Sequence, residues 1–176
     1  MKYNVIDVDA SSLQEKYQIG LLSAKLLMAS HLSDEEIHEL FNTDTALTTS
    51  KAECIQKCCK RLLQARDNHE KVMIAGDYDA DGMTSASIVK ESLEQLGAEC
   101  RVYLPNRFTD GYGPNASVYK YFIEQEGISL IVTVDNGVAG HEAIELAQSM
   151  GVDVIVTDHH SMPETLPDAY AIVHPE

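Results

Sequence analysis

The chain has 176 residues, of which 44% are hydrophobic and 23% are charged, and its formal net charge at pH 7 is −15. This length and composition are typical of a globular protein and exclude wholesale disorder. The negative charge argues against generic binding to nucleic acid or to an anionic membrane, because both need a cationic surface, but it is compatible with bound divalent metal ions.

The N-terminal segment MKYNVIDVDASS lacks the apolar core of a signal peptide, and no later apolar stretch approaches the roughly 20 residues that span a bilayer. We therefore predict a cytoplasmic protein with no membrane partner. The four cysteines form no C-x-x-C pair and have no histidines at zinc-site spacing, which predicts reduced thiols instead of a metal or redox site.

The first 70 residues are predicted to be helical. Apolar residues recur at helical spacing over 11–30, a capping-box pattern at 33–36 opens a second helix that is broken near 43–45, and a third helix covers 50–65. We expect the segment 1–70 to pack as a helical lead-in on the main body.

From residue 72 onward, short apolar runs alternate with helical patterns. The expected strands are VMIAGD from residue 72 and the segments 100–104, 129–134, 152–157 and 170–173. Three of the intervening helices end at a glycine that is followed at once by an apolar strand, which is typical of repeated βαβ units. Right-handed crossovers then predict an α/β fold, a parallel sheet with helices on both faces, over residues 71–176.

Polar turns follow four of the predicted strands. They comprise residues 77–81, 105–107, 135–137 and 158–160, and three of the four supply carboxylates. Ligands of such sheets bind beyond the carboxyl ends of the strands. We therefore expect the acidic clusters to converge on one edge of the sheet.

The first of these turns, GDYDADG, has the D-x-D-x-D-G start of an EF-hand calcium loop. An EF-hand needs a helix before the loop and a glutamate at its twelfth position, whereas here a strand precedes Asp77 and the twelfth residue is Ile88. A phosphate-binding P-loop is excluded as well, because its lysine and its second glycine are missing.

A metal site built from several strand ends explains the clusters better. Asp79 and Asp81 lie in the turn 77–81, Asp135 in the turn 135–137 and His159 in the turn 158–160. This set of oxygen and imidazole ligands favours Mn²⁺ or Mg²⁺. Two ions could share Asp135 as a bridging ligand. Two metals about 3.5–4 Å apart are the usual means of hydrolysing a phosphoester, since one activates the water and both offset the developing charge.

Simpler interpretations stay open for single residues. Asp81 or Asp135 could be a helix N-cap, and Arg107 could make a plain salt bridge instead of contacting an anion. Adjacent histidines behind Asp158 have no ordinary structural role. The isolated histidines are expected on solvated helix surfaces: His31, His38, His69 and His141.

The motifs GDYDADG, VTVDNG and TDHH, in this order at successive strand ends, resemble the DHH phosphoesterase superfamily. The intervening LPNRFTDGYGPN is similar to the RecJ branch, bacterial single-strand-specific 5′→3′ exonucleases, and the resemblance spans 72–176. It implies a hydrolase that uses Mn²⁺ or Mg²⁺, with two ions in the complete protein, to release mononucleotides from single-stranded DNA in repair and recombination. It also implies a single-strand-binding protein and a helicase as partners.

The resemblance implies roles for eight residues. The metal ligands would be Asp79, Asp81, Asp135 and His159. The other catalytic residues would be Asp77, Asp158 and His160, with Asp158 orienting a histidine, and the substrate phosphate would be bound by Arg107 and His160.

Two departures from the family pattern qualify the resemblance. Ala75 stands where many members carry a metal-binding histidine. The family also has a further metal-binding aspartate and a C-terminal substrate-binding domain, and this sequence contains neither. We therefore expect 71–176 to be an incomplete catalytic domain with weak or no nuclease activity alone. The rival hypotheses are a phosphoesterase for pyrophosphate, oligonucleotides or cyclic dinucleotides, and a non-catalytic binding module.

Overall fold

The computed structural model describes residues 8–42, 53–111 and 113–175. The chain divides into two compact units, Met1–Thr49 and Ser50–Glu176. Within the described residues, no helix is long and apolar enough to cross a membrane. All four cysteines are free thiols.

In the N-terminal unit, residues 8–42 form three short helices around a small core. They are α1 (Ser11–Tyr17), α2 (Leu21–Ala29) and α3 (Asp34–Leu40). The single helix predicted over 11–30 is wrong, because Gln18 adopts a left-handed conformation with φ 55° that ends α1 before Gly20 opens α2. The core residues are Ala10, Leu13, Ala24 and Ile37.

The capping box of α3 is confirmed. The Ser33 hydroxyl accepts a hydrogen bond from the Glu36 backbone N–H at 3.3 Å, and the Glu36 carboxylate accepts one from the Ser33 N–H at 2.8 Å. Both bonds satisfy N–H groups that have no partner inside the helix. The predicted break at 43–45 and the predicted helix start at residue 50 lie outside the described residues.

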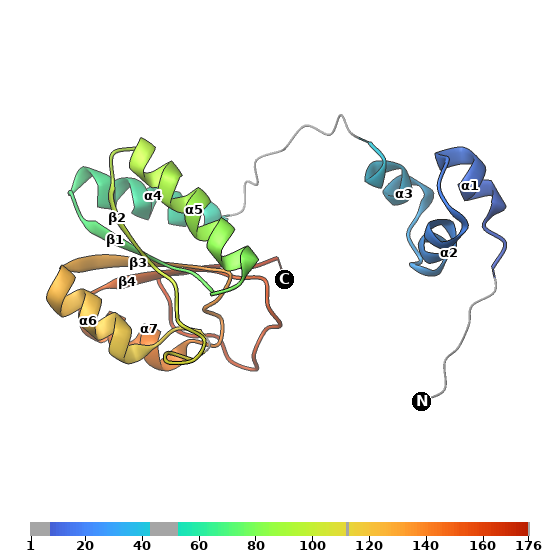
Figure 1. Ribbon diagram of the computed structural model, residues 1–176. Helices are drawn as coiled ribbons and strands as arrows, with labels where there is room; N and C mark the ends of the chain where they lie inside the picture. The colour runs from blue at the N-terminus through green and yellow to red at the C-terminus, as the bar shows by residue number, and fades with distance from the viewer. Residues whose placement is uncertain (1–7, 43–52, 112, 176) are drawn as a thin grey trace. The chain divides into compact units, whose positions relative to one another are not determined.

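The second unit is built on a parallel five-stranded sheet in the order β2-β1-β3-β4-β5. The strands are β1 (Lys71–Ala75), β2 (Glu99–Tyr103), β3 (Ile128–Val134), β4 (Asp153–Thr157) and β5 (Ala171–Val173). The helices are α4 (Glu53–Asp67), α5 (Ala80–Gln95), α6 (Ala116–Glu126) and α7 (His141–Ser149). In Figure 1, α4 and α5 lie on one face of the sheet and α6 and α7 on the other, so the predicted α/β fold is confirmed.

The central strands β1, β3 and β4 are mostly apolar without alternation because both faces of the sheet are covered there, whereas the edge strand β2 exposes Glu99 and Arg101. In β1, Val72 and Ile74 pack toward α4 and α5, whereas Met73 and Ala75 belong to the core beneath α6 and α7. All four are at most 4% exposed. A strand buried on both sides is therefore apolar at every position.

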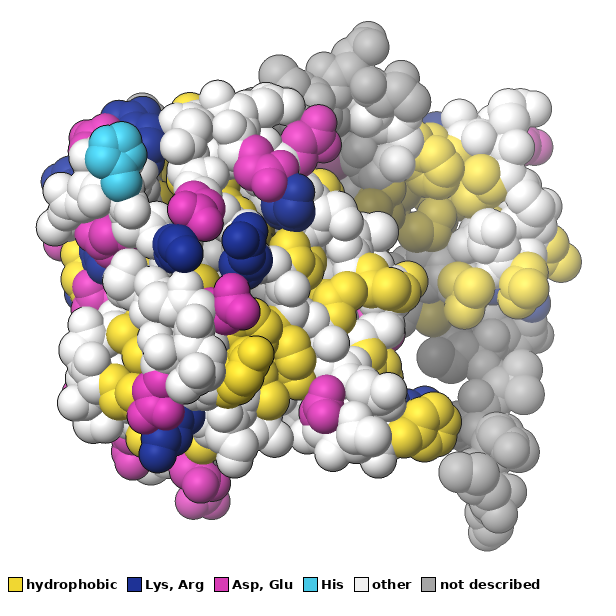
Figure 2. All heavy atoms as spheres, turned by 60° about the vertical axis from the view of Figure 1, so that its left-hand side comes forward, with side chains coloured by type: hydrophobic (Ala, Val, Ile, Leu, Met, Phe, Trp, Pro, Cys, Tyr) yellow, Lys and Arg dark blue, Asp and Glu magenta, His cyan; other side chains and the backbone are white. Residues whose placement is uncertain are grey.

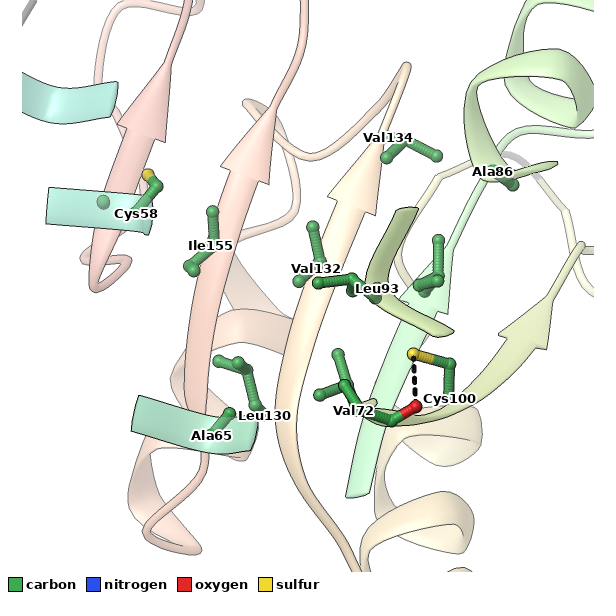
Figure 3. Packing of buried hydrophobic residues seen from close by; sticks show 13 residues of the cluster. Cys58, Ala65, Val72, Ala86, Leu93, Cys100, Leu130, Val132, Val134 and Ile155 are labelled. Carbon is green, nitrogen blue, oxygen red and sulfur yellow. Dashed lines mark hydrogen bonds between the residues drawn. The ribbon is translucent and has the colours of Figure 1, made fainter. Parts of the chain in front are cut away.

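Helix α4 belongs to the sheet unit. Its Cys58 and Ala65 are buried in the same cluster as Leu130 and Ile155 of the sheet, as Figure 3 shows. The compact unit Ser50–Glu176 therefore includes this helix as well as the sheet.

Candidate metal centre

The candidate site lies where the strand order of the sheet reverses. The chain leaves β1 to form β2 on one side of it and then returns to form β3 on the other side. The crossovers that follow β1 and β3 therefore diverge and leave a crevice at the carboxyl ends of these strands, where parallel sheets bind ligands. The acidic motifs 76–82 and 135–137 both begin at this crevice.

The turn after β1 is shaped by Asp79, which is the N-cap of α5. One oxygen of the Asp79 carboxylate, Oδ1, accepts hydrogen bonds from the backbone N–H groups of Asp81 and Gly82, each at 3.0 Å. The capping role that was left open for Asp81 therefore belongs to Asp79, and Asp81 lies in the first turn of the helix with a 63% exposed side chain.

A close backbone approach buries Asp77 in the same turn. A Cβ atom added to Gly82 would lie 2.5 Å from the backbone nitrogen of Asp77, so only glycine lets α5 begin against this strand end. Asp77 is 3% exposed, and its Oδ1 accepts a hydrogen bond from the Tyr78 N–H at 2.6 Å. The sequence pattern alone did not show why the motif must end in glycine.

Asp135 leaves β3 in a left-handed conformation with φ 61° and is not a helix cap. Its backbone N–H donates to the Thr157 carbonyl at 3.0 Å. The next residue, Asn136, ties two strands together, because its side-chain amide donates to the carbonyl oxygens of Ala75 at 3.3 Å and Val134 at 3.1 Å. The sequence pattern assigned no role to Asn136, although an asparagine directly after an apolar strand is a usable signal, because a polar side chain there must find hydrogen-bond partners if it is buried.

The turn after β4 is organised by Asp158. Its Oδ1 accepts hydrogen bonds from the backbone N–H groups of His159 and His160 at 2.7 and 3.0 Å, and its Oδ2 accepts one from the Val138 N–H at 2.9 Å. The same Oδ1 lies 2.8 Å from Nδ1 of His160, so the carboxylate fixes the orientation of that imidazole ring.

These side chains meet in two overlapping groups that share Asp135. The groups are Asp77, Asp79 and Asp135, and Asp135, His159 and His160; within each, one ligand atom per residue lies within 4.8 Å of the others. Asp81 belongs to neither group, but its Oδ2 is 3.6 Å from Nε2 of His159. Asp77 thus lies among the candidate ligands, whereas the resemblance implied a supporting role for it.

The carboxylates at this site have no permanently charged cation beside them in the described part of the chain. None of the five aspartates pairs with a lysine or an arginine among the described residues; the partners are histidines, with Nε2 of His159 at 2.8 Å from Asp135. Burial raises the pKa of Asp135, and the charges of Asp81 and Asp79 raise it further, against the hydrogen bond from His159. A divalent cation would relieve this repulsion, so the residues fit Mn²⁺ or Mg²⁺.

The Asp158–His160 pair shows the opposite electrostatics. Burial raises the pKa of Asp158, but the hydrogen bonds that the carboxylate accepts from Val138 and His160 lower it below its ordinary value. The hydrogen bond to Asp158 raises the pKa of His160. The pair is therefore stabilised as a carboxylate and a protonated imidazole.

An open cleft of about 680 Å³ gives access to the site, with Asp81, Asp135, Asp158 and His159 on its wall. Its other lining residues come from α4, α5, β4 and the segment from β5 to the chain end: Cys54, Ile55, Ser85, Thr157, Val173, His174 and Pro175. A second cavity of about 370 Å³ lies beside His160 and is lined mainly by residues 136–140 and Pro114. The centre is thus accessible from solvent.

The remaining predicted residues lie outside the two groups. The Arg107 guanidinium packs over the Tyr78 ring at 5.7 Å from its centroid, and its contact with phosphate stays a prediction. His31 and His69 lie in turns with positive φ and not on the helix surfaces that were expected for them. The side chain of His141 makes a hydrogen bond within the chain, with its Nε2 2.9 Å from the Thr165 carbonyl oxygen.

Comparison with known proteins identifies the sheet unit. Residues 71–176 match the model of the DHH family, N-terminal domain. The chain is 42% identical over 168 residues to the single-stranded-DNA-specific exonuclease RecJ of Bacillus subtilis, a match that covers 94% of this chain and 21% of that protein. It is 40% identical over 153 residues to the RecJ of Haemophilus influenzae, which covers 86% of this chain and 26% of that protein.

Two solved structures have the same fold. A crystal structure of exonuclease RecJ bound to manganese matches with a TM-score of 0.68 and 32% identity, over 74% of this chain and 33% of that one. RecJ of Thermus thermophilus in complex with Mn²⁺ matches with a TM-score of 0.64 and 26% identity, over 92% of this chain and 22% of that one. Because the family model covers more than half of the sequence, the chain belongs to the DHH family.

Proposed function

We propose that this chain is the catalytic portion of a metal-dependent phosphodiesterase that hydrolyses single-stranded DNA from its 5′ end. The observation that carries the proposal is the pair of ligand groups that share Asp135 beside an open cleft, with no lysine or arginine paired to their carboxylates among the described residues. The names of the relatives in Bacillus subtilis and Haemophilus influenzae support single-stranded DNA as the substrate. The chain spans only 21% and 26% of their lengths, so the activity is proposed for the complete protein.

Each group of residues has a chemical task in this proposal. Asp77, Asp79, Asp135 and His159 would hold Mn²⁺ or Mg²⁺, and Asp81 lies close enough to His159 to complete the set. When bound, the metal supplies a Lewis acid that offsets the charge developing on the phosphoryl group. The matching crystal structures with manganese support this choice of ion.

His160 would act on the substrate phosphate. Its Nδ1 is held by Asp158, so its Nε2 lies on the opposite side of the ring from this carboxylate. Because the pKa of His160 is raised, a larger fraction of the imidazole is protonated near neutral pH. A protonated His160 can donate a hydrogen bond from Nε2 to a phosphate oxygen, and Arg107 would contact the strand from the loop after β2.

The charge of the chain restricts how it can hold DNA. On the face of the molecule shown in Figure 2, Lys and Arg side chains lie among Asp and Glu side chains. A strand would then be held by metal ions and a few local contacts at the site. The 5′ polarity, the cytoplasmic location, and the partnership with a single-strand-binding protein and a helicase rest on the family resemblance and belong to the same proposal.

The decisive experiment replaces Asp135 by asparagine in the complete protein. We expect the release of mononucleotides from 5′-phosphorylated single-stranded DNA with Mn²⁺ to fall by about a thousandfold or more, because both ligand groups lose a shared charge. The matched control is Asp168→Asn, which changes an exposed carboxylate outside both groups. An unchanged rate in Asp135→Asn would refute the mechanism.

The same assay, run on different substrates, distinguishes the rival hypotheses for the function. An exonuclease degrades long single strands faster than duplexes and dinucleotides. Faster turnover of dinucleotides or pyrophosphate would support a small-substrate phosphoesterase instead. Absence of turnover with every substrate, in a folded complete protein, would support the non-catalytic binding module.

A further inference from the structure

The loop between β2 and α6 holds an unusually exposed aromatic side chain. Phe108 is 94% exposed, whereas the other exposed large hydrophobic residues of the described chain range from 36% to 74%. A phenylalanine that contacts only water forgoes the free energy of burial. Two explanations are available for this exposure: the side chain binds a partner, or the loop is too irregular to bury it.

The loop is not irregular, because Asp110 organises it. Oδ2 of this carboxylate accepts hydrogen bonds from the Tyr103 hydroxyl at 3.0 Å and from the Asn106 backbone N–H at 2.8 Å. The Asn106 side chain in turn accepts a hydrogen bond from the backbone N–H of Phe108 at 2.9 Å. The outward position of Phe108 therefore follows from a defined turn.

The same loop contacts the first metal-binding turn. Arg107, the residue before Phe108, packs over the ring of Tyr78, which stands between Asp77 and Asp79. Strands β1 and β2 are parallel neighbours, with Ala75 paired to Tyr103. The loop and the acidic turn thus leave the sheet at the same edge.

We propose that Phe108 is a stacking platform for a base of the single strand that enters the metal centre. The inference rests on the proposed function and adds a contact that recognises bases. Aromatic side chains bind single strands with little sequence preference, because every base presents a π-face. Stacking also suits a chain of net charge −15, which has few cations with which to hold phosphates.

The first test compares three variants of the complete protein: Phe108→Ala, Phe108→Leu and Phe108→Trp. We expect the KM for 5′-phosphorylated oligo(dT) to rise about 5- to 100-fold in the alanine variant, with a smaller change in kcat. Tryptophan should preserve the KM, and leucine should not, since leucine is apolar but cannot stack. The matched control is Tyr121→Ala on α6, another exposed aromatic residue.

An oligonucleotide that lacks bases at its first positions tests whether Phe108 contacts a base. With abasic residues at the first positions of the oligonucleotide, the KM of wild type should no longer be lower than the KM of Phe108→Ala. An equal KM for both proteins on normal oligo(dT) would refute the stacking. A fall in thermal stability without a change in KM would show that Phe108 packs against another part of the complete protein instead.

Fluorescence supplies a readout that is independent of turnover. The chain contains no tryptophan, so Phe108→Trp adds one local reporter, read as the difference in emission from wild type. In the Asp135→Asn background we expect quenching as oligo(dT) saturates the protein, and binding with unchanged emission would contradict the proposal. Failure of wild type to bind or cleave single strands would instead refute the proposed function itself.

Discussion

The sheet unit buries charge at both ends of its strands, in two different ways. At the amino ends, Arg61 of α4 lies 2.7 Å from the Glu70 carboxylate and 2.6 Å from the Asp153 carboxylate. At the carboxyl ends, Asp77 and Asp135 are buried without a lysine or arginine partner among the described residues. The carboxylates of the first cluster are paired with a cation of the chain itself, and those of the second are not.

The difference separates a cluster that is paired within the fold from the candidate metal centre. Burial raises the pKa of Glu70, but the hydrogen bonds from Arg61 lower it below its ordinary value. Burial also raises the pKa of Asp135, and neighbouring carboxylates add to this effect. Carboxylates with their own cation stabilise the fold, whereas carboxylates held close together without one are stabilised when a metal ion binds.

Metal binding should produce the largest difference in stability between the two clusters. Mn²⁺ at a thousand times its Kd is expected to raise the free energy of unfolding by about 4 kcal/mol, because the ion binds only the folded protein. Asp135→Asn should remove most of this gain, while Glu70→Gln should keep it, since Glu70 lies at the opposite end of the strands. Thermal unfolding with and without the ion measures both effects, and equal gains in the two variants would contradict the prediction.

Removal of the cation at the structural cluster should have the next largest effect. Arg61→Met leaves Glu70 and Asp153 close together without their partner, and we expect it to destabilise the fold by about 2 kcal/mol, below the usual 3–5 for a fully buried pair because Asp153 is partly exposed. Urea unfolding of metal-free protein measures the change. The control is Arg66→Met, which breaks a more exposed pair with Asp67 and should cost less than about 1 kcal/mol.

Metal binding should survive the loss of Arg61. If Arg61→Met abolished the stabilisation by Mn²⁺ in a protein that is still folded, the two clusters would be coupled, and the separation between structural and functional charge would not hold.

The sheet and the convergence of the acidic turns at one edge of it were predictable from the sequence because they depend on local and repeating signals. Apolar strands, helices that end at glycine and right-handed crossovers determine a parallel sheet. Parallel strands then bring Asp79, Asp135 and His159 to one edge, whatever the details of the turns. The predicted cluster at the strand ends follows from this topology.

The features that escaped prediction depend on backbone geometry or on distant pairs. The left-handed Gln18 that divides α1 from α2 has no glycine to mark it. Asp77 lies with the candidate ligands because Gly82 lets α5 begin against its backbone. The pairing of Arg61 with Asp153 joins residues 92 positions apart, a separation that no local pattern reveals.

The smallest predicted effect is a difference in the sign of the pH dependence. The folded-state pKa of Glu70 is lowered, so its contribution to stability is present above its unfolded pKa of about 4.3 and is lost as the pH falls through the folded value. The folded-state pKa of Asp135 is raised, so its contribution is present below its unfolded pKa of about 3.9 and is lost as the pH rises through the folded value.

Urea unfolding of metal-free protein between about pH 3.5 and pH 7 should resolve the two signs. Relative to wild type, Glu70→Gln should become less stable as the pH rises, because only wild type gains the ion pair with Arg61. Asp135→Asn should become more stable relative to wild type over the same interval, because only wild type must ionise a buried carboxyl group beside Asp79 and Asp81. The same sign for both variants would show that Asp135 is neutralised by the folded chain, and the need for a metal ion at the carboxyl ends of the strands would lose its electrostatic basis.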